Sequence, residues 1–125
     1  MGSVKIDIHR RERQYENQFP MHTEEGVQVF LENITYVRSR RLKGDMDASL
    51  LLLDFEKTLS ESPLSRRERE VLYWHYEREF TEKETARALG ISISAVKEYK
   101  QRIALKIADT VAVQEGYKHA VPSNE

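Results

Sequence analysis

The chain of 125 residues contains no cysteine, which excludes disulfides and thiolate metal sites. It has no long apolar run either: the longest, residues 50–53, is far shorter than the roughly 20 residues that a membrane-spanning helix needs. The N-terminus lacks the apolar stretch of a secretory signal, so we expect a cytoplasmic protein without membrane contact. No phosphate-cradling glycine loop, nucleophile elbow or carboxylate dyad occurs, and we expect neither enzymatic activity nor a cofactor.

A strong net charge is also missing. Twenty Lys and Arg residues face 21 Asp and Glu residues, giving a formal net charge of −1, whereas a nucleic-acid-binding domain is usually basic. The distribution is uneven, however, because one segment contains Lys97, Lys100, Arg102 and Lys106, opposed there only by Glu98. A nucleic-acid phosphate responds to charges within about a Debye length, so this local cluster of basic residues matters more than the net charge of the whole chain.

Helical patterns dominate the first half of the chain. One helix is predicted over residues 23–43, with Thr23 as N-cap and Gly44 as its end. A second is predicted over residues 47–59, capped by Asp45 or Asp47. Its apolar side is wide and must pack on something; it comprises Leu50, Leu51, Leu53, Phe55 and Leu59. Before these helices, alternating apolar residues at positions 4, 6 and 8 hint at a strand.

Two capping boxes mark helix starts in the second half. In Ser65-Arg66-Arg67-Glu68 and again in Thr81-Glu82-Lys83-Glu84, a hydroxyl residue precedes a glutamate by three positions. Gly90 is expected to end the helix that starts at Thr81, and Ser92 or Ser94 to cap a last helix reaching about Val113. The aromatic residues Tyr73, Trp74 and Tyr76 are expected to pack in the core rather than to stack on nucleobases, because they lie at helical spacing.

Residues 81–99 predict a helix, a tight turn and a second helix. The small Ala86 lets the two helices cross closely, and Gly90 permits the turn. Leu89, Ile91 and Val96 would fill the wedge between them. This pattern is typical of a helix-turn-helix, whose second helix enters the DNA major groove.

Residues 63–107 resemble region 4 of bacterial sigma factors, a module that reads promoter DNA. The matching stretches are "LSRREREVLYWHY", "FTEKETARALGIS" and "SAVKEYKQRIALKI". The LuxR-type DNA-binding domain is similar too, but the loop between Val71 and Ala86 is one residue longer than the usual LuxR-type pattern. Two positions depart from the sigma pattern: Thr85 replaces an aliphatic residue and Tyr99 a common arginine. Nothing in the first 62 residues resembles sigma region 2.

The resemblance implies a set of DNA-contacting residues at the start of the last helix. Ser94 and Glu98 lie four residues apart, hence on one face, where they would contact base edges. Lys97, Lys100 and Arg102 would clamp phosphates. The full implied set is Ser92, Ser94, Ala95, Lys97, Glu98, Lys100, Gln101 and Arg102.

The sequence therefore predicts an all-α protein, with a helical N-terminal element followed by a C-terminal helix-turn-helix module. Residues 1–62 would form an N-terminal docking or dimerisation element, residues 63–113 the DNA-binding domain, and residues 114–125 a flexible tail. Alternatively, the N-terminal leucines only complete one shared core.

The predicted function is sequence-specific binding of double-stranded promoter DNA by a sigma-like activator that contacts RNA polymerase. The helical prefix before a region 4-like end also looks like small regulators of phages and prophages. The alternative is an interaction module that uses the helix-turn-helix scaffold on RNA polymerase or another regulator without reading DNA.

Overall fold

The computed structural model describes residues 19–116, so the predicted strand near residues 4–8 and most of the predicted tail lie outside the described residues. Within 19–116 all regular structure is helical, which confirms the all-α prediction. The elements in chain order are α2 (Glu24–Glu32), α3 (Ile34–Leu42), α4 (Met46–Glu61), α5 (Arg66–Val71), the π-helix η2 (Leu72–Glu77), α6 (Glu82–Leu89) and α7 (Ile93–Gln114). No helix in this described part is long and apolar enough to cross a membrane.

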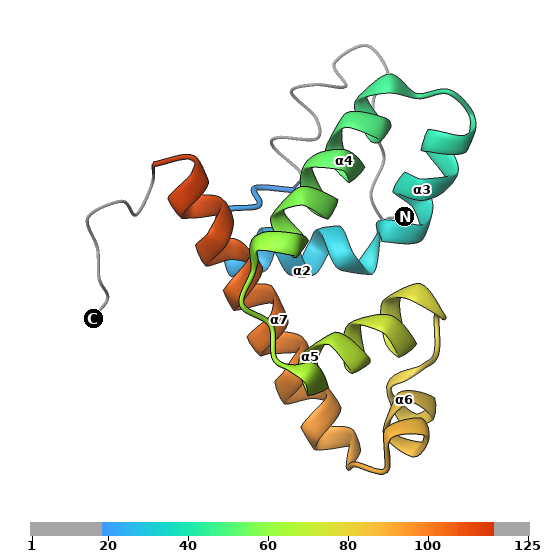
Figure 1. Ribbon diagram of the computed structural model, residues 1–125. Helices are drawn as coiled ribbons and strands as arrows, with labels where there is room; N and C mark the ends of the chain where they lie inside the picture. The colour runs from blue at the N-terminus through green and yellow to red at the C-terminus, as the bar shows by residue number, and fades with distance from the viewer. Residues whose placement is uncertain (1–18, 117–125) are drawn as a thin grey trace.

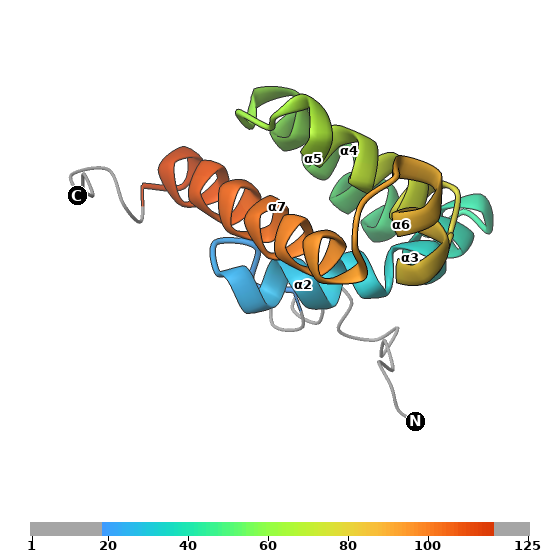
Figure 2. The ribbon, with the colours of Figure 1, turned by 90° about the horizontal axis from the view of Figure 1, so that it is seen from below.

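The long helix α7 is the centre of the fold. Helices α2, α4, α5 and α6 all pack against it, with α6 beside its N-terminal end (Figure 1). Seen from below, α7 has α2 on one side and α4 and α5 on the other (Figure 2). Both halves of the chain are therefore assembled around one helix.

The helix predicted over residues 23–43 is wrong in one respect: it is interrupted at Asn33, which separates α2 from α3. Asn33 leaves the helical conformation (φ −111°, ψ 12°), and its side-chain amide donates to the Val29 carbonyl at 2.8 Å. Asparagine side chains bond nearby backbone in this way and so favour helix ends over helix interiors. The break redirects α3, which packs on α4.

The predicted start and end of the first helical segment are confirmed, whereas α4 runs to Glu61 rather than to residue 59. The Thr23 hydroxyl accepts the Gly26 amide at 3.0 Å, and Gly44 has a positive φ of 89° just after α3. Of the two candidate caps for α4, Asp45 takes the role, since its Oδ1 accepts the Ala48 amide at 3.1 Å. Gly26 also has a steric role, because a Cβ at this position would collide with the Pro20 carbonyl.

Helix α4 uses its leucines differently from the predicted list. Leu52, which the sequence pattern did not single out, is buried together with Phe55. Leu50 and Leu53 are instead 52% and 50% exposed. In a run of four leucines on one helix, successive residues point about 100° apart, so only part of the run faces the core.

The N-terminal helices and the C-terminal module share one hydrophobic core, the alternative that the sequence left open. A single cluster of buried residues extends from Phe19 through Phe30 and Val71 to Val111. At its N-terminal end the Phe30 ring lies 5.5 Å from Phe19 and 4.8 Å from Phe55, measured between ring centroids. A docking or dimerisation role of the N-terminal half stays a prediction, now resting on the leucines that remain exposed.

The segment after α5 winds as a π-helix, which the sequence did not predict. Only Tyr76 of the three aromatic residues expected in the core is buried. Tyr73 is 46% exposed, and Trp74 is half-buried with its ring against Tyr73 and Phe80. Arg38 of α3 holds this segment by donating to the Tyr76 carbonyl at 3.3 Å and to Glu77 at 2.9 Å.

Candidate nucleic-acid interface

Short-range hydrogen bonds fix the start of α6 and the turn that follows it. The capping box at the start of α6 is complete: the Thr81 hydroxyl accepts the Glu84 amide at 3.0 Å, and the Glu84 carboxylate accepts the Thr81 amide at 2.9 Å. At its end Gly90 has φ 69°, where a side chain would be strained. The Gly90 and Ile91 amides donate back to the carbonyls of Arg87 and Ala86, the two bonds of a Schellman motif.

The wedge between α6 and α7 is apolar and closely packed. Ala86 and Val96 are buried where the two helices meet, while Leu89 and Ile91 are half-buried beside them. The structure therefore confirms the predicted helix-turn-helix geometry. The buried, small side chain of Ala86 sets how closely the helices cross.

Thr85, one of the two residues that depart from the sigma pattern, lies fully buried beside Ala86, and its hydroxyl has no hydrogen-bond partner among the described residues. We expect Thr85→Val to stabilise the protein by about 1 kcal/mol, because an unpaired buried hydroxyl costs free energy that a methyl group does not. Urea denaturation measures the change. Thr58→Val is the matched control, and we expect it to destabilise the protein, because the buried Thr58 hydroxyl donates a hydrogen bond to Gln114 at 3.1 Å. A destabilised Thr85→Val variant would contradict the prediction.

The predicted base-contacting residues lie on an exposed face at the start of α7. Ser92 is the N-cap, and its hydroxyl accepts the Ala95 amide at 3.0 Å. Ala95 is half-buried and less available than its neighbours. Of the predicted residues on this turn-proximal part of α7, those that are exposed are Ser94, Lys97, Glu98, Gln101 and Arg102. Their contacts with DNA remain predictions, but the structure brings them together on one surface.

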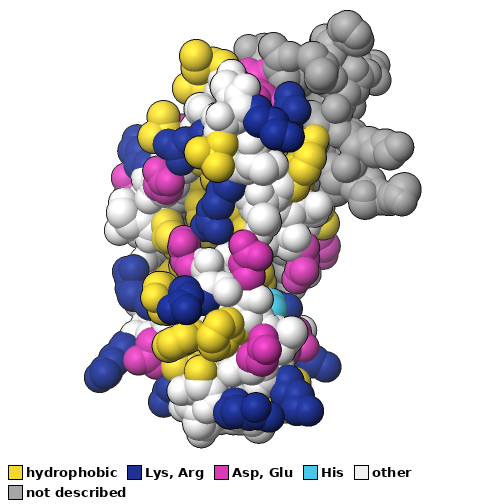
Figure 3. Space-filling view, turned by 90° about the vertical axis from the view of Figure 1, so that its right-hand side faces the viewer, with side chains coloured by type: hydrophobic (Ala, Val, Ile, Leu, Met, Phe, Trp, Pro, Cys, Tyr) yellow, Lys and Arg dark blue, Asp and Glu magenta, His cyan; other side chains and the backbone are white. Residues whose placement is uncertain are grey.

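The basic residues of α7 differ in their availability. Lys97 is exposed and makes no close ion pair with another residue of the described chain. Arg102 lies 5.3 Å from the Tyr99 ring centre and only loosely, at 3.9 Å, from Glu98. Lys and Arg side chains gather around the lower end of the molecule, where α6 and the start of α7 lie (Figure 3). This end of the molecule offers positive charge even though the whole chain is almost neutral.

Lys100 occupies a position that the sequence did not predict. Its Nζ lies 2.8 Å from Glu82 Oε2 and 3.4 Å from Glu32 Oε2, and its side chain is only 17% exposed. The ammonium also lies 6.0 Å from the centre of the Tyr76 ring. A phosphate clamp needs a free ammonium, so these contacts favour a different role for Lys100 than the one implied by the resemblance.

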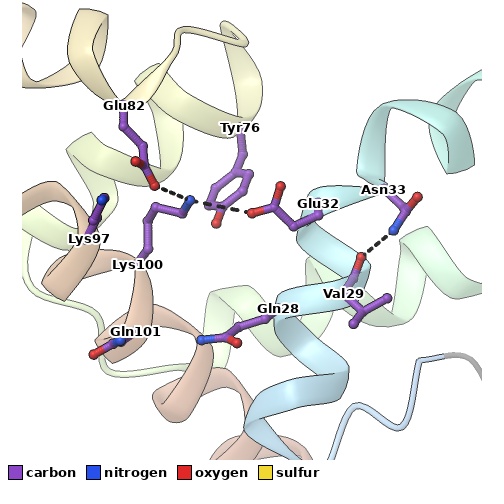
Figure 4. Close-up of a pocket in the computed structure, with 9 residues that line it drawn as sticks. All are labelled: Gln28, Val29, Glu32, Asn33, Tyr76, Glu82, Lys97, Lys100 and Gln101. Atoms are coloured by element: carbon purple, nitrogen blue, oxygen red, sulfur yellow. Dashed lines mark hydrogen bonds and ion pairs between the residues drawn. The ribbon is translucent and has the colours of Figure 1, made fainter. Parts of the chain in front are cut away.

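A groove of about 470 Å³ lies between the first turns of α7 and the C-terminal part of α2 (Figure 4). Its α2 side carries Gln28, Val29, Glu32 and Asn33, and its opposite side carries Tyr76, Glu82, Lys97, Lys100 and Gln101. Sequence reasoning missed the α2 residues, because nothing local to α2 indicates that it lies beside α7.

The charges in this groove affect one another. A hydrogen bond from Lys100 lowers the pKa of the Glu82 carboxyl, despite partial burial, so Glu82 stays ionised. Burial raises the pKa of the Tyr76 phenol, and the carboxylates of Glu32 and Glu82 raise it further. Burial lowers the pKa of nearby His75, helped by Lys100 and opposed by the bond from its Nδ1 to the Phe80 carbonyl. The groove thus holds two lysines, two glutamates and a neutral tyrosine.

Lys106, the last member of the basic cluster, has a structural partner. Its Nζ donates to the buried Glu68 carboxylate at 2.9 Å, joining α7 to the capping box of α5. Burial by itself would raise the pKa of Glu68, but the hydrogen bonds from Lys106 and from the Ser65 amide outweigh it, and the pKa lies below its ordinary value of 4.5. The charged form of Glu68 is therefore favoured by folding.

We expect Glu68→Gln to cost about 1 kcal/mol at neutral pH, because glutamine keeps the capping box but loses the charge-assisted bond to Lys106. Since the folded pKa is lowered, this contribution is present above about pH 4.5 and is lost as the pH falls through the folded pKa. Thermal melts of both proteins across this range measure it. Glu56→Gln, at an exposed surface ion pair with Arg41, serves as the control. A stability difference that stays constant down to pH 3 would contradict the assignment.

Helices α6 and α7 thus form a helix-turn-helix, the motif whose second helix, here α7, enters the DNA major groove in DNA-binding proteins. Residues 63–107 match the family model of sigma-70, region 4, so this segment is a sigma-70 region 4-like helix-turn-helix domain. The match supports a role in DNA binding and RNA polymerase interaction in general. Searches of curated proteins and of solved structures find no match.

Proposed function

We propose that the protein is a sequence-specific DNA-binding transcription regulator, a sigma-like activator that reads promoter duplex DNA with the start of α7 and contacts RNA polymerase. The observation that carries this proposal is the exposed polar face of α7, presented by a packed helix-turn-helix within the segment that matches sigma-70 region 4. Ser94, Glu98 and Gln101 would contact base edges, and Lys97 and Arg102 would contact phosphates. We call these five exposed residues of α7 the reading face. This proposal includes no catalytic activity.

Lys97→Ala tests the proposal. We expect weaker binding to all duplexes alike, with the salt slope of binding lowered by about one unit, because one phosphate contact is lost. Fluorescence anisotropy of labelled promoter and mixed-sequence duplexes across a salt series measures both. Lys57→Ala is the control, since Lys57 is an exposed lysine on α4 away from the reading face. An unchanged slope in Lys97→Ala would remove the phosphate assignment.

One observation favours a second candidate, a module that binds protein through the same scaffold. Glu98 is exposed in the middle of the reading face, and Lys100 is neutralised by two carboxylates. A carboxylate that enters the DNA major groove is repelled by the DNA phosphates unless it meets a cytosine amino group. If the purified protein binds RNA polymerase but no duplex at low salt, this second function replaces the first.

The N-terminal half is proposed as a docking or dimerisation element of such a regulator, of the small phage or prophage type that the helical prefix resembles. Met46, Leu50 and Leu53 support this, because they are exposed at helical spacing on one side of α4.

A further inference from the structure

Lys100 is shared by three parts of the fold. Lys100 lies on α7, while Glu82 belongs to α6 and Glu32 belongs to α2 in the N-terminal half. The Glu32 side chain is 59% exposed and approaches Lys100 from the far side of the groove (Figure 4). Glu82 alone would already pair with Lys100 at 2.8 Å. The contact from Glu32 is therefore an addition that the helix-turn-helix itself does not require.

This contact lies beside the reading face. Lys97 and Gln101, two exposed residues of that face, line the same groove as Glu32 and Gln28. A phosphate backbone that reached Lys97 from this side would meet the Glu32 carboxylate within the distance over which charges act. It would find Lys100 already occupied, because an ammonium held between two carboxylates gains little from a third anion.

We propose that Glu32 is an affinity-setting residue, which together with Glu82 holds Lys100 away from the DNA phosphates and thereby weakens duplex binding by α7. The inference rests on the proposed DNA-reading function. It gives α2 a role in recognition beyond its part in the core. The competing explanation is that the Glu32–Lys100 pair only fastens α2 to α7, in which case its loss changes stability and not DNA affinity.

The test is Glu32→Gln in the full chain, measured by anisotropy with a labelled mixed-sequence duplex between about 50 and 200 mM salt. We expect about two- to fivefold tighter binding at the lowest salt concentration, because a partly exposed ion pair contributes a free energy of that size. We also expect a salt slope steeper by up to about one unit, equivalent to a roughly 3.5-fold greater loss of affinity across this range.

Two controls separate the ion pair from net charge. Glu25→Gln makes the same charge change on the same helix, at an exposed residue with no ion pair to another described residue. In a Lys100→Met background, which keeps the apolar stem of the side chain, Glu32→Gln should give a clearly smaller gain in affinity, because only the direct repulsion between Glu32 and phosphate is then removed. Lys100→Met alone should leave the wild-type salt slope unchanged.

The inference is overturned if Glu32→Gln binds no more tightly than the wild type, if Glu25→Gln gives an equal gain, or if the gain is undiminished in the Lys100→Met background. Thermal melts confirm that each variant is folded at the assay temperature. If neither the wild type nor any variant binds duplex at low salt, the proposed function fails and this inference falls with it. If the wild type binds and only the gain is missing, the inference alone is wrong.

Discussion

Phe30→Ala should cost about 3–5 kcal/mol, a large share of the stability of a small domain. Phe30 is fully buried on α2, and its ring lies between those of Phe19 and Phe55. Truncation removes its contacts with both rings and leaves a cavity. Because the core is continuous from Phe30 to the helix-turn-helix, we expect the whole chain to lose stability together.

The single tryptophan makes this expectation measurable. Trp74 lies at η2 in the C-terminal module, so its fluorescence reports on the half that does not contain the substitution. Circular dichroism and Trp74 fluorescence should give one coincident urea transition, shifted equally by Phe30→Ala. Leu42→Ala is the control, since Leu42 is 88% exposed. A Trp74 transition that stays at its wild-type midpoint would show that the two halves fold independently.

Ala86→Leu should be the most damaging change within the helix-turn-helix itself. The side chain of Ala86 is buried where α6 crosses α7, beside Val96, and there is no room for three more carbons. Overpacking of this kind costs about 1–3 kcal/mol and displaces the backbone. A shift of α7 relative to α6 would also move the reading face, so we expect DNA affinity to fall in molecules that remain folded.

Arg87→Leu provides the comparison for stability, because it adds an apolar side chain at the exposed neighbouring position. Urea denaturation should separate the two variants, and anisotropy below the melting temperature should show the loss of binding in Ala86→Leu. An Ala86→Leu protein with wild-type melting temperature and wild-type affinity would contradict the close crossing of α6 and α7 at this residue.

The sequence by itself determined the features that depend on residues a few positions apart. Both capping boxes, the Thr23 cap and the left-handed Gly90 follow from interactions between residues no more than five positions apart in the chain, and the structure contains all of them. The sequence left the cap of α4 open between Asp45 and Asp47, and the structure selects Asp45. Ala86 and Val96 were placed correctly for the same reason, since a helix-turn-helix is a short, contiguous unit. That Ser94 and Glu98 share one face of α7 also follows from helical periodicity.

Only the tertiary structure decided which residues of similar chemistry have partners. Lys97 and Lys100 look alike in the sequence, yet one is exposed and the other is held by Glu32 and Glu82. Leu52 is buried while Leu50 and Leu53 are not. In each case the partner comes from another helix, and its position depends on how α2, α4 and α6 pack against α7. Burial and ion pairing are properties of that packing, so the local periodicity that predicted the helices contains no information about them.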